Sequence, residues 1–308
     1  MVSRSAFKTA GGESEYFAAY DAAMRLWPVP FEDVAVPSRF GSTHVVVSGP
    51  PDGDALVLLH GFMVTAAMWS PNVGDLCRRH RVYAVDTMGQ PGKNLPADPM
   101  GEPADLVEWL AAVLDGLGLD DVDLAGMSFG AWIALNFAMA APNRVRRLVL
   151  LSPAASLQPL VRQFGLRGMM AGIFPTRRMA ASLMRWMGFR ETPGNEINTR
   201  LIELMWLGMR DFRMPPEARR LIPDAFPDDA LRSLEMPVLL LLGENEVIYD
   251  PAKALARARR LIANLEGELI PDCSHDMSIS RAQIVNRRIL DFLNEAGTDA
   301  RDGRNPPS

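Results

Sequence analysis

The sequence predicts an α/β fold in which helices cover both faces of a parallel β-sheet. Short apolar runs, typical of buried strands, alternate with stretches at helical spacing through most of the chain. The 308 residues are 48% apolar, which is ample for a large core and argues against overall disorder. The alternation lapses between residues 154 and 235, so we expect that segment to be an insertion between two strands of one sheet.

The elements are expected in a regular order. A first helix over 13–27 carries aromatic and apolar side chains at helical spacing and stops before Pro28. Two short β-rich pieces follow, at 34–37 and 44–48. The further strands are predicted at 55–59, 82–85, 122–125, 145–151, 238–242 and 268–270. The helices between and after them are predicted at 66–79, 104–117, 131–140, 252–263 and 281–293.

These elements divide the chain into a discontinuous core and an insertion. We expect residues 30–153 and 236–295 to form the α/β core. Residues 154–235, rich in Met, Trp, Phe and Arg and broken by prolines, read as several short helices that form a cap. Residues 1–29 are a helical extension, and 296–308 form a polar tail that we expect to be disordered.

Composition narrows the class of partner. The net charge of −5 has the wrong sign for a nucleic-acid-binding protein. No apolar run reaches the roughly 18 residues of a membrane span, and the N-terminus lacks the apolar stretch of a secretory signal. Two cysteines are too few for a disulfide framework. We therefore expect a cytoplasmic protein that acts on a small molecule, without a nucleic-acid or membrane partner.

The sharpest motif is Gly126-Met-Ser128-Phe-Gly130. It follows the strand at 122–125 and opens the helix at 131–140, which is the context of a catalytic serine on a tight strand-to-helix turn. Side chains at the glycine positions would collide with neighbouring backbone, and the helix N-terminus favours negative charge near the serine. The bare pattern also occurs in turns by chance, but in this context it predicts that Ser128 is a nucleophile.

A second motif, His60-Gly61-Phe62, comes directly after the strand at 55–59. Functional groups gather at the carboxyl ends of parallel strands. The backbone N–H of Phe62 is therefore expected to join that of Phe129 in an oxyanion hole. His60 itself is expected to fix the loop rather than act as a base.

These motifs, in this order, resemble the α/β-hydrolase superfamily. The resemblance runs from about residue 34 to about residue 293. It rests on His60-Gly61-Phe62, Met68-Trp69, Asp86-x-x-Gly89, the serine turn, Gly243-Glu244-x-Glu246 and Ser274-His275. It implies an eight-stranded, mostly parallel sheet and the chain order nucleophile, acid, histidine.

His275 is the expected base. It alone among the four histidines follows the last strand-like run, at 268–270, in a short loop before a helix, where the family keeps its catalytic histidine. His44 lies in an early strand. His80 lies among arginines at what we expect to be a solvated helix end.

Two carboxylates compete for the acid role. The family usually carries Asp or Glu three residues after the glycine that ends the strand at 238–242, which is Glu246 here. Most members have Asp, so Glu is a departure, but its carboxylate can still accept the imidazole N–H. Asp250 precedes Pro251 and is expected to cap a helix, although it stays the alternative acid.

The remaining polar residues have simpler interpretations. Asp86 resembles a turn-fixing residue of the family, and Cys273 is expected to pack. Asp272 and Asp276 are expected in solvent. No cluster has metal-ligand spacing and no phosphate-binding loop is present, so we expect no metal and no cofactor.

The sequence therefore predicts a serine hydrolase of the carboxylesterase or lactonase type, acting on a small to medium apolar acyl group. Two alternatives stay open: a C–C bond hydrolase of vinylogous diketones with the same triad, and a non-catalytic ligand-binding protein of the same fold. Family members with a carboxylate nucleophile are excluded by Ser128. The apolar lining expected from the cap is Met169, Met170, Phe174, Met184, Trp186, Met187, Met205, Trp206 and Met209.

Overall fold

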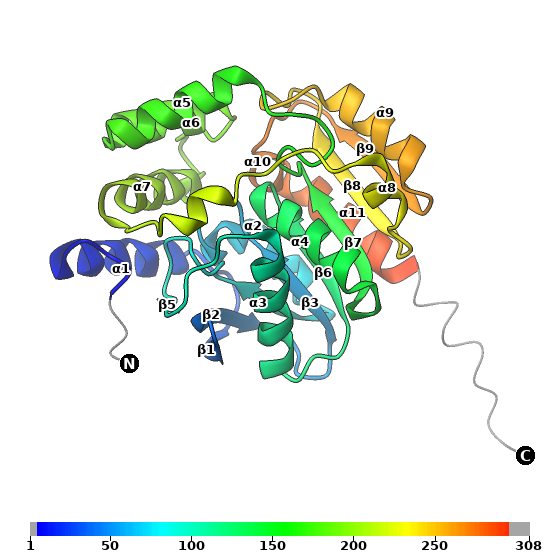
Figure 1. The fold of residues 1–308 in the computed structure, drawn as a ribbon, viewed down its shortest axis with the longest axis horizontal. Helices are drawn as coiled ribbons and strands as arrows, with labels where there is room; N and C mark the ends of the chain where they lie inside the picture. The colour runs from blue at the N-terminus through cyan, green and yellow to red at the C-terminus, as the bar shows by residue number, and fades with distance from the viewer. Residues whose placement is uncertain (1–4, 296–308) are drawn as a thin grey trace, which may run out of the picture.

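The computed structural model describes residues 5–295 and contains a twisted sheet between two layers of helices (Figure 1). Eight strands follow one another in the order β1-β2-β4-β3-β6-β7-β8-β9, and a ninth, β5, pairs with β2. The tail expected to be disordered, 296–308, lies outside the described residues. The α/β-hydrolase fold implied by the motifs is confirmed by this topology.

The strands are parallel from β4 onward. The hairpin of β1 and β2 is antiparallel, as is the pair β2 and β4, whereas every neighbouring pair from β4 to β9 is parallel. The strand β5 was not predicted, because two residues that include a proline carry no periodic signal. The strands are β1 (Phe31–Ser38), β2 (Gly41–Ser48), β3 (Asp54–Leu59), β4 (His80–Val85), β5 (Leu95–Pro96), β6 (Val122–Met127), β7 (Val145–Leu151), β8 (Val238–Gly243) and β9 (Leu265–Ile270).

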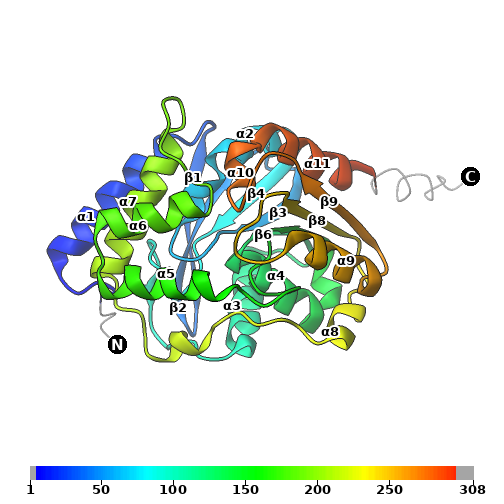
Figure 2. The ribbon, with the colours of Figure 1, turned by 90° about the horizontal axis from the view of Figure 1, so that it is seen from above.

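Helices cover both faces of this sheet. Figure 2 shows α2 and α11 on one face and α3, α4 and α9 on the other. The helix predicted over 66–79 starts at the expected residue, as the 3-10 turn η1, but its end was wrong: α2 stops at Leu76, and β4 already starts at His80. These helical elements are η1 (Ala66–Trp69), α2 (Ser70–Leu76), α3 (Pro103–Gly116), α4 (Phe129–Ala140), η2 (Pro142–Arg144), α9 (Pro251–Leu261), α10 (Met277–Ser280) and α11 (Ala282–Glu295).

Five helical pieces lie between β7 and β8. They are α5 (Arg162–Ile173), α6 (Arg177–Trp186), α7 (Glu196–Asp211), η3 (Glu217–Arg220) and α8 (Asp228–Arg232). The short α8 lies against α9, where Arg257 and Asp228 form an ion pair of 2.7 Å. The helices α5, α6 and α7 lie apart from α8, on the other side of the molecule in Figure 1.

The N-terminal helix α1 (Ala10–Met24) packs on α7 (Figure 1). It starts earlier than expected because Thr9 accepts the N–H of Gly12 and caps it. Next to it, the N–H of Lys8 donates to Asp211 O at 2.8 Å, and the rings of Phe7 and Phe212 meet edge to face. The extension therefore holds α7 in place.

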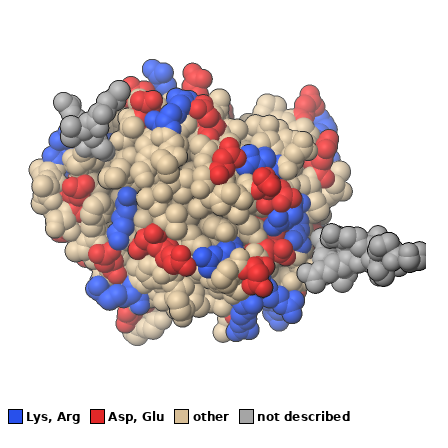
Figure 3. Space-filling view, turned by 90° about the horizontal axis from the view of Figure 1, so that it is seen from below, with Lys and Arg blue, Asp and Glu red and all other residues tan. Residues whose placement is uncertain are grey.

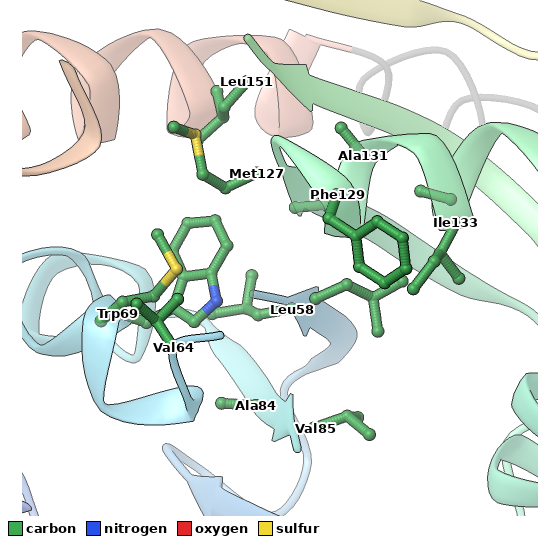
Figure 4. Packing of buried hydrophobic residues seen from close by; sticks show 14 of the residues in the cluster. Leu58, Val64, Trp69, Ala84, Val85, Met127, Phe129, Ala131, Ile133 and Leu151 are labelled. Atoms are coloured by element: carbon green, nitrogen blue, oxygen red, sulfur yellow. The ribbon is translucent and has the colours of Figure 1, made fainter. Parts of the chain in front are cut away.

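The core lies around the central strands. All six residues of β8 are buried, as expected for a parallel strand covered on both faces. Figure 4 shows Leu58 of β3, Val85 of β4 and Met127 of β6 packed with Trp69 of η1 and Phe129 of α4. None of the helices in the described part of the chain combines the length and apolar character needed to cross a bilayer.

Candidate active site

Ser128 lies on a sharp turn between β6 and α4. Its backbone has φ 55° and ψ −112°, a region that residues with a side chain rarely adopt. Glycines make the turn possible, because a Cβ on Gly126 would lie 2.5 Å from Ala131 N, and one on Gly130 would lie 2.2 Å from Leu59 O. The turn that the motif predicts is present, and it lies at the carboxyl edge of the sheet.

The imidazole of His275 lies against the Ser128 hydroxyl. His275 follows β9 in the loop before α10, and its Nε2 is 2.8 Å from Ser128 Oγ. Its Nδ1 is 2.8 Å from Glu246 Oε2. When Nδ1–H donates to the carboxylate, Nε2 keeps a lone pair for the serine proton. Three residues that are distant in the chain therefore form one continuous series of hydrogen bonds.

Glu246 is oriented by its own loop. Its Oε1 accepts the N–H groups of Val247 at 2.9 Å and Ile248 at 3.1 Å, which leaves Oε2 for His275. Burial raises the pKa of Glu246, but His275, the N–H of Ile248 and the hydroxyl of Ser152 together outweigh burial, so the net pKa is lowered. Through this hydrogen bond the ionised carboxylate fixes the orientation of the His275 ring.

Asp250, the alternative acid, is used elsewhere. Its side chain accepts the N–H of Lys253 at 3.1 Å and caps α9, as its place before Pro251 predicts. The exposed Asp250 carboxylate also pairs with the Lys253 ammonium at 3.1 Å. The position beside His275 Nδ1 belongs to Glu246.

Two backbone N–H groups are available beside the serine. Phe129 is the first residue of α4, so its N–H has no partner within the helix. Phe62 follows Gly61, where an added Cβ would lie 3.7 Å from Ser128 Cβ, and the rings of Phe62 and Phe129 meet edge to face at 5.7 Å. Neither N–H donates a hydrogen bond to any residue between 5 and 295. Both can therefore donate to a bound anion.

Two other histidines have structural contacts. His60 Nδ1 lies 2.7 Å from Gly61 O, and its Nε2 accepts the N–H of Thr87 at 2.9 Å, so it fixes the loop as expected. The expectation that His80 is solvated was wrong. Its side chain is buried at the start of β4, with Nδ1 3.3 Å from Leu76 O, although its sequence neighbours are arginines.

His44 forms a second histidine–carboxylate pair, with Asp86. Its Nδ1 is 3.0 Å from Asp86 Oδ2, and its Nε2 is 2.8 Å from Asp33 Oδ1. Asp86 also accepts the N–H groups of Ala66 at 2.9 Å and Lys93 at 3.2 Å. Asp86 therefore fixes turns, as expected, and holds a histidine that the sequence did not link to it.

The residues around His275 are mostly structural. Cys273 is buried, its thiol donates to Ile270 O at 3.2 Å, and burial raises its pKa to about 12, so the reactive thiolate is disfavoured. Asp276 was expected in solvent, but it is buried and accepts the N–H of Ser274. Asp272 is exposed, as expected. Within the described part of the chain, no three His, Cys, Asp or Glu side chains are grouped to hold a metal ion.

An apolar cavity of about 410 Å³ borders Ser128 and His275. Apart from these two residues and Arg219, the cavity is lined by apolar side chains and glycines. Eight methionines, whose flexible thioethers adapt to irregular ligands, are among the lining residues. They are Met68, Met127, Met169, Met184, Met187, Met205, Met209 and Met214.

The sequence predicted the lining of this cavity only in part. Five of the nine expected residues line it: Met169, Met184, Met187, Met205 and Met209. Met170 and Phe174 are exposed instead, Trp186 stacks on Phe164, and the Trp206 N–H donates to a backbone carbonyl. Helical spacing shows which side chains share one face of a helix, but not whether that face contacts the cavity, another helix or solvent. Lining residues that were missed include Leu160, Phe164, Leu183, Met214, Arg219, Leu221 and Ile222.

The sequence pattern of the alpha/beta hydrolase family matches residues 56–288. The chain belongs to this family. It is 34% identical over 279 residues to an uncharacterized carboxylesterase, nap, of Bacillus subtilis (strain 168), with 91% of this chain and 92% of that protein covered. It is 35% identical over 283 residues to the carboxylesterase YbfK of the same strain, with 90% and 93% covered.

A solved structure extends this similarity to three dimensions. The crystal structure of naproxen esterase (carboxylesterase NP) from Bacillus subtilis has a TM-score of 0.85 against this chain. The two are 32% identical, and the match covers 93% of this chain and 99% of that structure.

Proposed function

We propose that the protein is a serine carboxylesterase that cleaves small-molecule esters with a small to medium apolar acyl group, lactones included. The observation that carries this proposal is the series Ser128–His275–Glu246, with both links at 2.8 Å, at the wall of an apolar cavity. The similar proteins named as carboxylesterases support the reaction class. A cavity of about 410 Å³ suits such an acyl group, since small-molecule pockets measure about 300–1,000 Å³.

In the proposed reaction, Ser128 Oγ attacks the ester carbonyl carbon while its proton moves to His275 Nε2. The N–H groups of Phe62 and Phe129 hold the negative oxygen of the tetrahedral intermediate, and Glu246 stabilises the imidazolium. The intermediate collapses, and the alcohol leaves with the proton from His275. Water then gives a proton to His275 and attacks the acyl carbon. The bond from that carbon to Ser128 Oγ breaks, His275 returns the proton to Oγ, and the acid leaves.

The cap assignment is part of the same proposal. Residues 154–235 contribute most of the cavity wall from α5, α6, α7 and η3, and we propose that they set acyl specificity. A cytoplasmic location remains the expectation from the sequence.

The proposal is tested by labelling and by turnover. A fluorophosphonate probe should label the wild type and Ser156→Ala, which removes a buried serine outside the cavity, but not Ser128→Ala. A series of p-nitrophenyl esters from acetate to decanoate should show highest kcat/KM at short to medium chains. An absence of labelling and turnover in the folded wild type would favour the non-catalytic binder. Faster cleavage of a vinylogous diketone than of any ester would favour the C–C hydrolase.

A further inference from the structure

The helix α5 turns an apolar stripe toward solvent. Leu166, Met169, Met170 and Ile173 recur at the spacing i, i+3, i+4, i+7, which places them on one face of the helix. Amphipathic helices normally bury such a stripe, yet Leu166, Met169 and Ile173 are 58%, 54% and 59% exposed. The only fully buried residue of α5 is Ala171. Figure 2 looks down on α5, and no other element covers it from that side.

Exposed apolar side chains concentrate at this helix. Between residues 5 and 295, ten large apolar side chains are exposed, and six of them lie on α5 or directly beside it. We call these six the α5 patch: Val161, Leu166, Met169, Met170, Ile173 and Phe174. Two further members of the ten, Phe62 and Ile222, line the cavity together with Met169. The α5 patch is therefore continuous with the mouth of the cavity.

The same segment is strongly basic in an acidic protein. Residues 154–190 contain six arginines and no Asp or Glu, whereas the whole chain has a net charge of −5. Arg177 and Arg185 pair with Glu191. Arg162, Arg178 and Arg190 have no acidic partner among the described residues. On the opposite side of the molecule, acidic and basic side chains are interspersed (Figure 3).

We propose that the α5 patch docks on an anionic phospholipid surface. An exposed apolar stripe flanked by arginines is the signature of a helix that lies in the membrane interface, where the stripe contacts acyl chains and the guanidinium groups reach the phosphates. Docking of this kind needs no membrane-spanning segment, and the proposal replaces the expectation, drawn from the sequence, that the protein has no membrane partner. It places the cavity mouth against the lipid, so that an apolar ester can pass from the lipid layer to Ser128.

A second copy of the chain fits this surface less well. A two-fold dimer would place the same patch on both subunits face to face. The arginines of 154–190 would then oppose one another without an acidic residue of that segment between them. The charge of the segment favours an anionic partner, and its continuity with the cavity favours an amphiphile layer over a protein.

The test measures binding separately from catalysis. Full-length Ser128→Ala protein is floated with phosphatidylcholine vesicles, with or without one third phosphatidylglycerol. We expect binding to the anionic vesicles only, weakened by salt because the charges are exposed. Leu166→Gln/Ile173→Gln and, separately, Arg162→Gln/Arg178→Gln should each reduce the partition coefficient on the order of tenfold. None of these four residues lines the cavity, so turnover of a soluble short-chain ester with Ser128 intact should stay at the wild-type rate.

Matched controls remove exposed residues of the same types elsewhere. Leu95→Gln, on β5, and Arg287→Gln, on α11, should leave vesicle binding unchanged. An equal loss in these controls would overturn the proposal. So would absence of binding to anionic vesicles, or a concentration-dependent dimer that is abolished by Leu166→Gln/Ile173→Gln. Because the binding assay uses the catalytically inert Ser128→Ala variant, a lack of vesicle binding would leave the proposed esterase activity unaffected.

Discussion

Histidine–carboxylate pairs occur at two places in this molecule, beside the cavity and between β2 and the end of β4. In both pairs the carboxylate lies within 3.0 Å of the histidine Nδ1: 2.8 Å for Glu246 and His275, 3.0 Å for Asp86 and His44. In both, the histidine is almost fully buried. By distance and burial alone, the two pairs would be equally good candidates for a catalytic site.

The difference lies at the other ring nitrogen. His44 Nε2 is occupied by a second carboxylate, Asp33, at 2.8 Å. His275 Nε2 instead meets the hydroxyl of Ser128, whose strained backbone and neighbouring cavity leave room for a substrate. A histidine between two carboxylates has both ring nitrogens occupied, whereas one between a carboxylate and a hydroxyl has a nitrogen placed to accept the hydroxyl proton during a reaction. The first arrangement stabilises the fold and the second suits catalysis.

The largest difference should appear when each of the two histidines is replaced by alanine. His275→Ala is expected to reduce kcat by about 10⁶-fold, the scale seen when a triad base is removed. His44→Ala should keep kcat within about tenfold, because His44 does not contact the cavity, while it lowers stability. Steady-state hydrolysis of a p-nitrophenyl ester and urea unfolding of both variants measure this. A similar loss of kcat in both variants would contradict the comparison.

The acid should matter less than the base. Glu246→Gln keeps the shape of the side chain but no longer stabilises the imidazolium or fixes its tautomer, so kcat should fall by about 10⁴-fold. Asp250→Asn is the matched control on the same loop. Its carboxylate caps α9, so we expect near wild-type kcat. If Asp250→Asn caused the larger loss, the acid would be Asp250.

The Ser128 turn and the location of His275 could be predicted because their signals are local. Glycine is needed at 126 and 130 because a side chain at either position would collide with neighbouring backbone in any such turn. His275 is the one histidine that follows the last strand. The parallel sheet was predictable for the same reason, since each buried strand is a continuous apolar run.

The sequence named Glu246 as the acid only through the spacing of the family it resembles, and local signals fail outright at His80 and the α5 stripe. Glu246 and Asp250 share one loop, and only hydrogen bonds to two successive N–H groups turn Glu246 inward. His80 has arginine neighbours in sequence, but it is the first residue of β4 and its side chain is buried. The stripe of α5 has the spacing of a buried face, so its exposure depends on what the fold leaves uncovered.

The two acids around His44 should differ in their effect on stability. Asp86 is fully buried, holds His44 Nδ1 and accepts the N–H groups of Ala66 and Lys93, so Asp86→Ala leaves three polar groups without this partner and should lower the free energy of unfolding by about 3–5 kcal/mol. The Asp33 side chain is 54% exposed, and Asp33→Ala should cost about 1 kcal/mol or less. Urea unfolding of both variants near pH 6 gives the comparison. Equal costs would mean that solvent reaches both carboxylates alike.

The smallest expected effect is on the pH dependence of stability. Burial lowers the pKa of His44, but the hydrogen bonds and charges of Asp86 and Asp33 outweigh burial and raise it. A raised folded-state pKa contributes stability that is fully present below the unfolded pKa of about 6.5 and is lost as the pH rises through the folded value. Wild-type stability should therefore decline as the pH rises above about 6.5.

His44→Gln isolates this contribution. Burial lowers the pKa of both His60 and His80, so their effect has the opposite sign: stability rises with pH through their folded values and levels off by about pH 6.5. Above that pH, the wild type and His44→Gln should differ in slope only through His44. Urea unfolding from about pH 6.5 to 9 measures both slopes, and parallel slopes would mean that Asp86 and Asp33 do not hold His44 in its charged form.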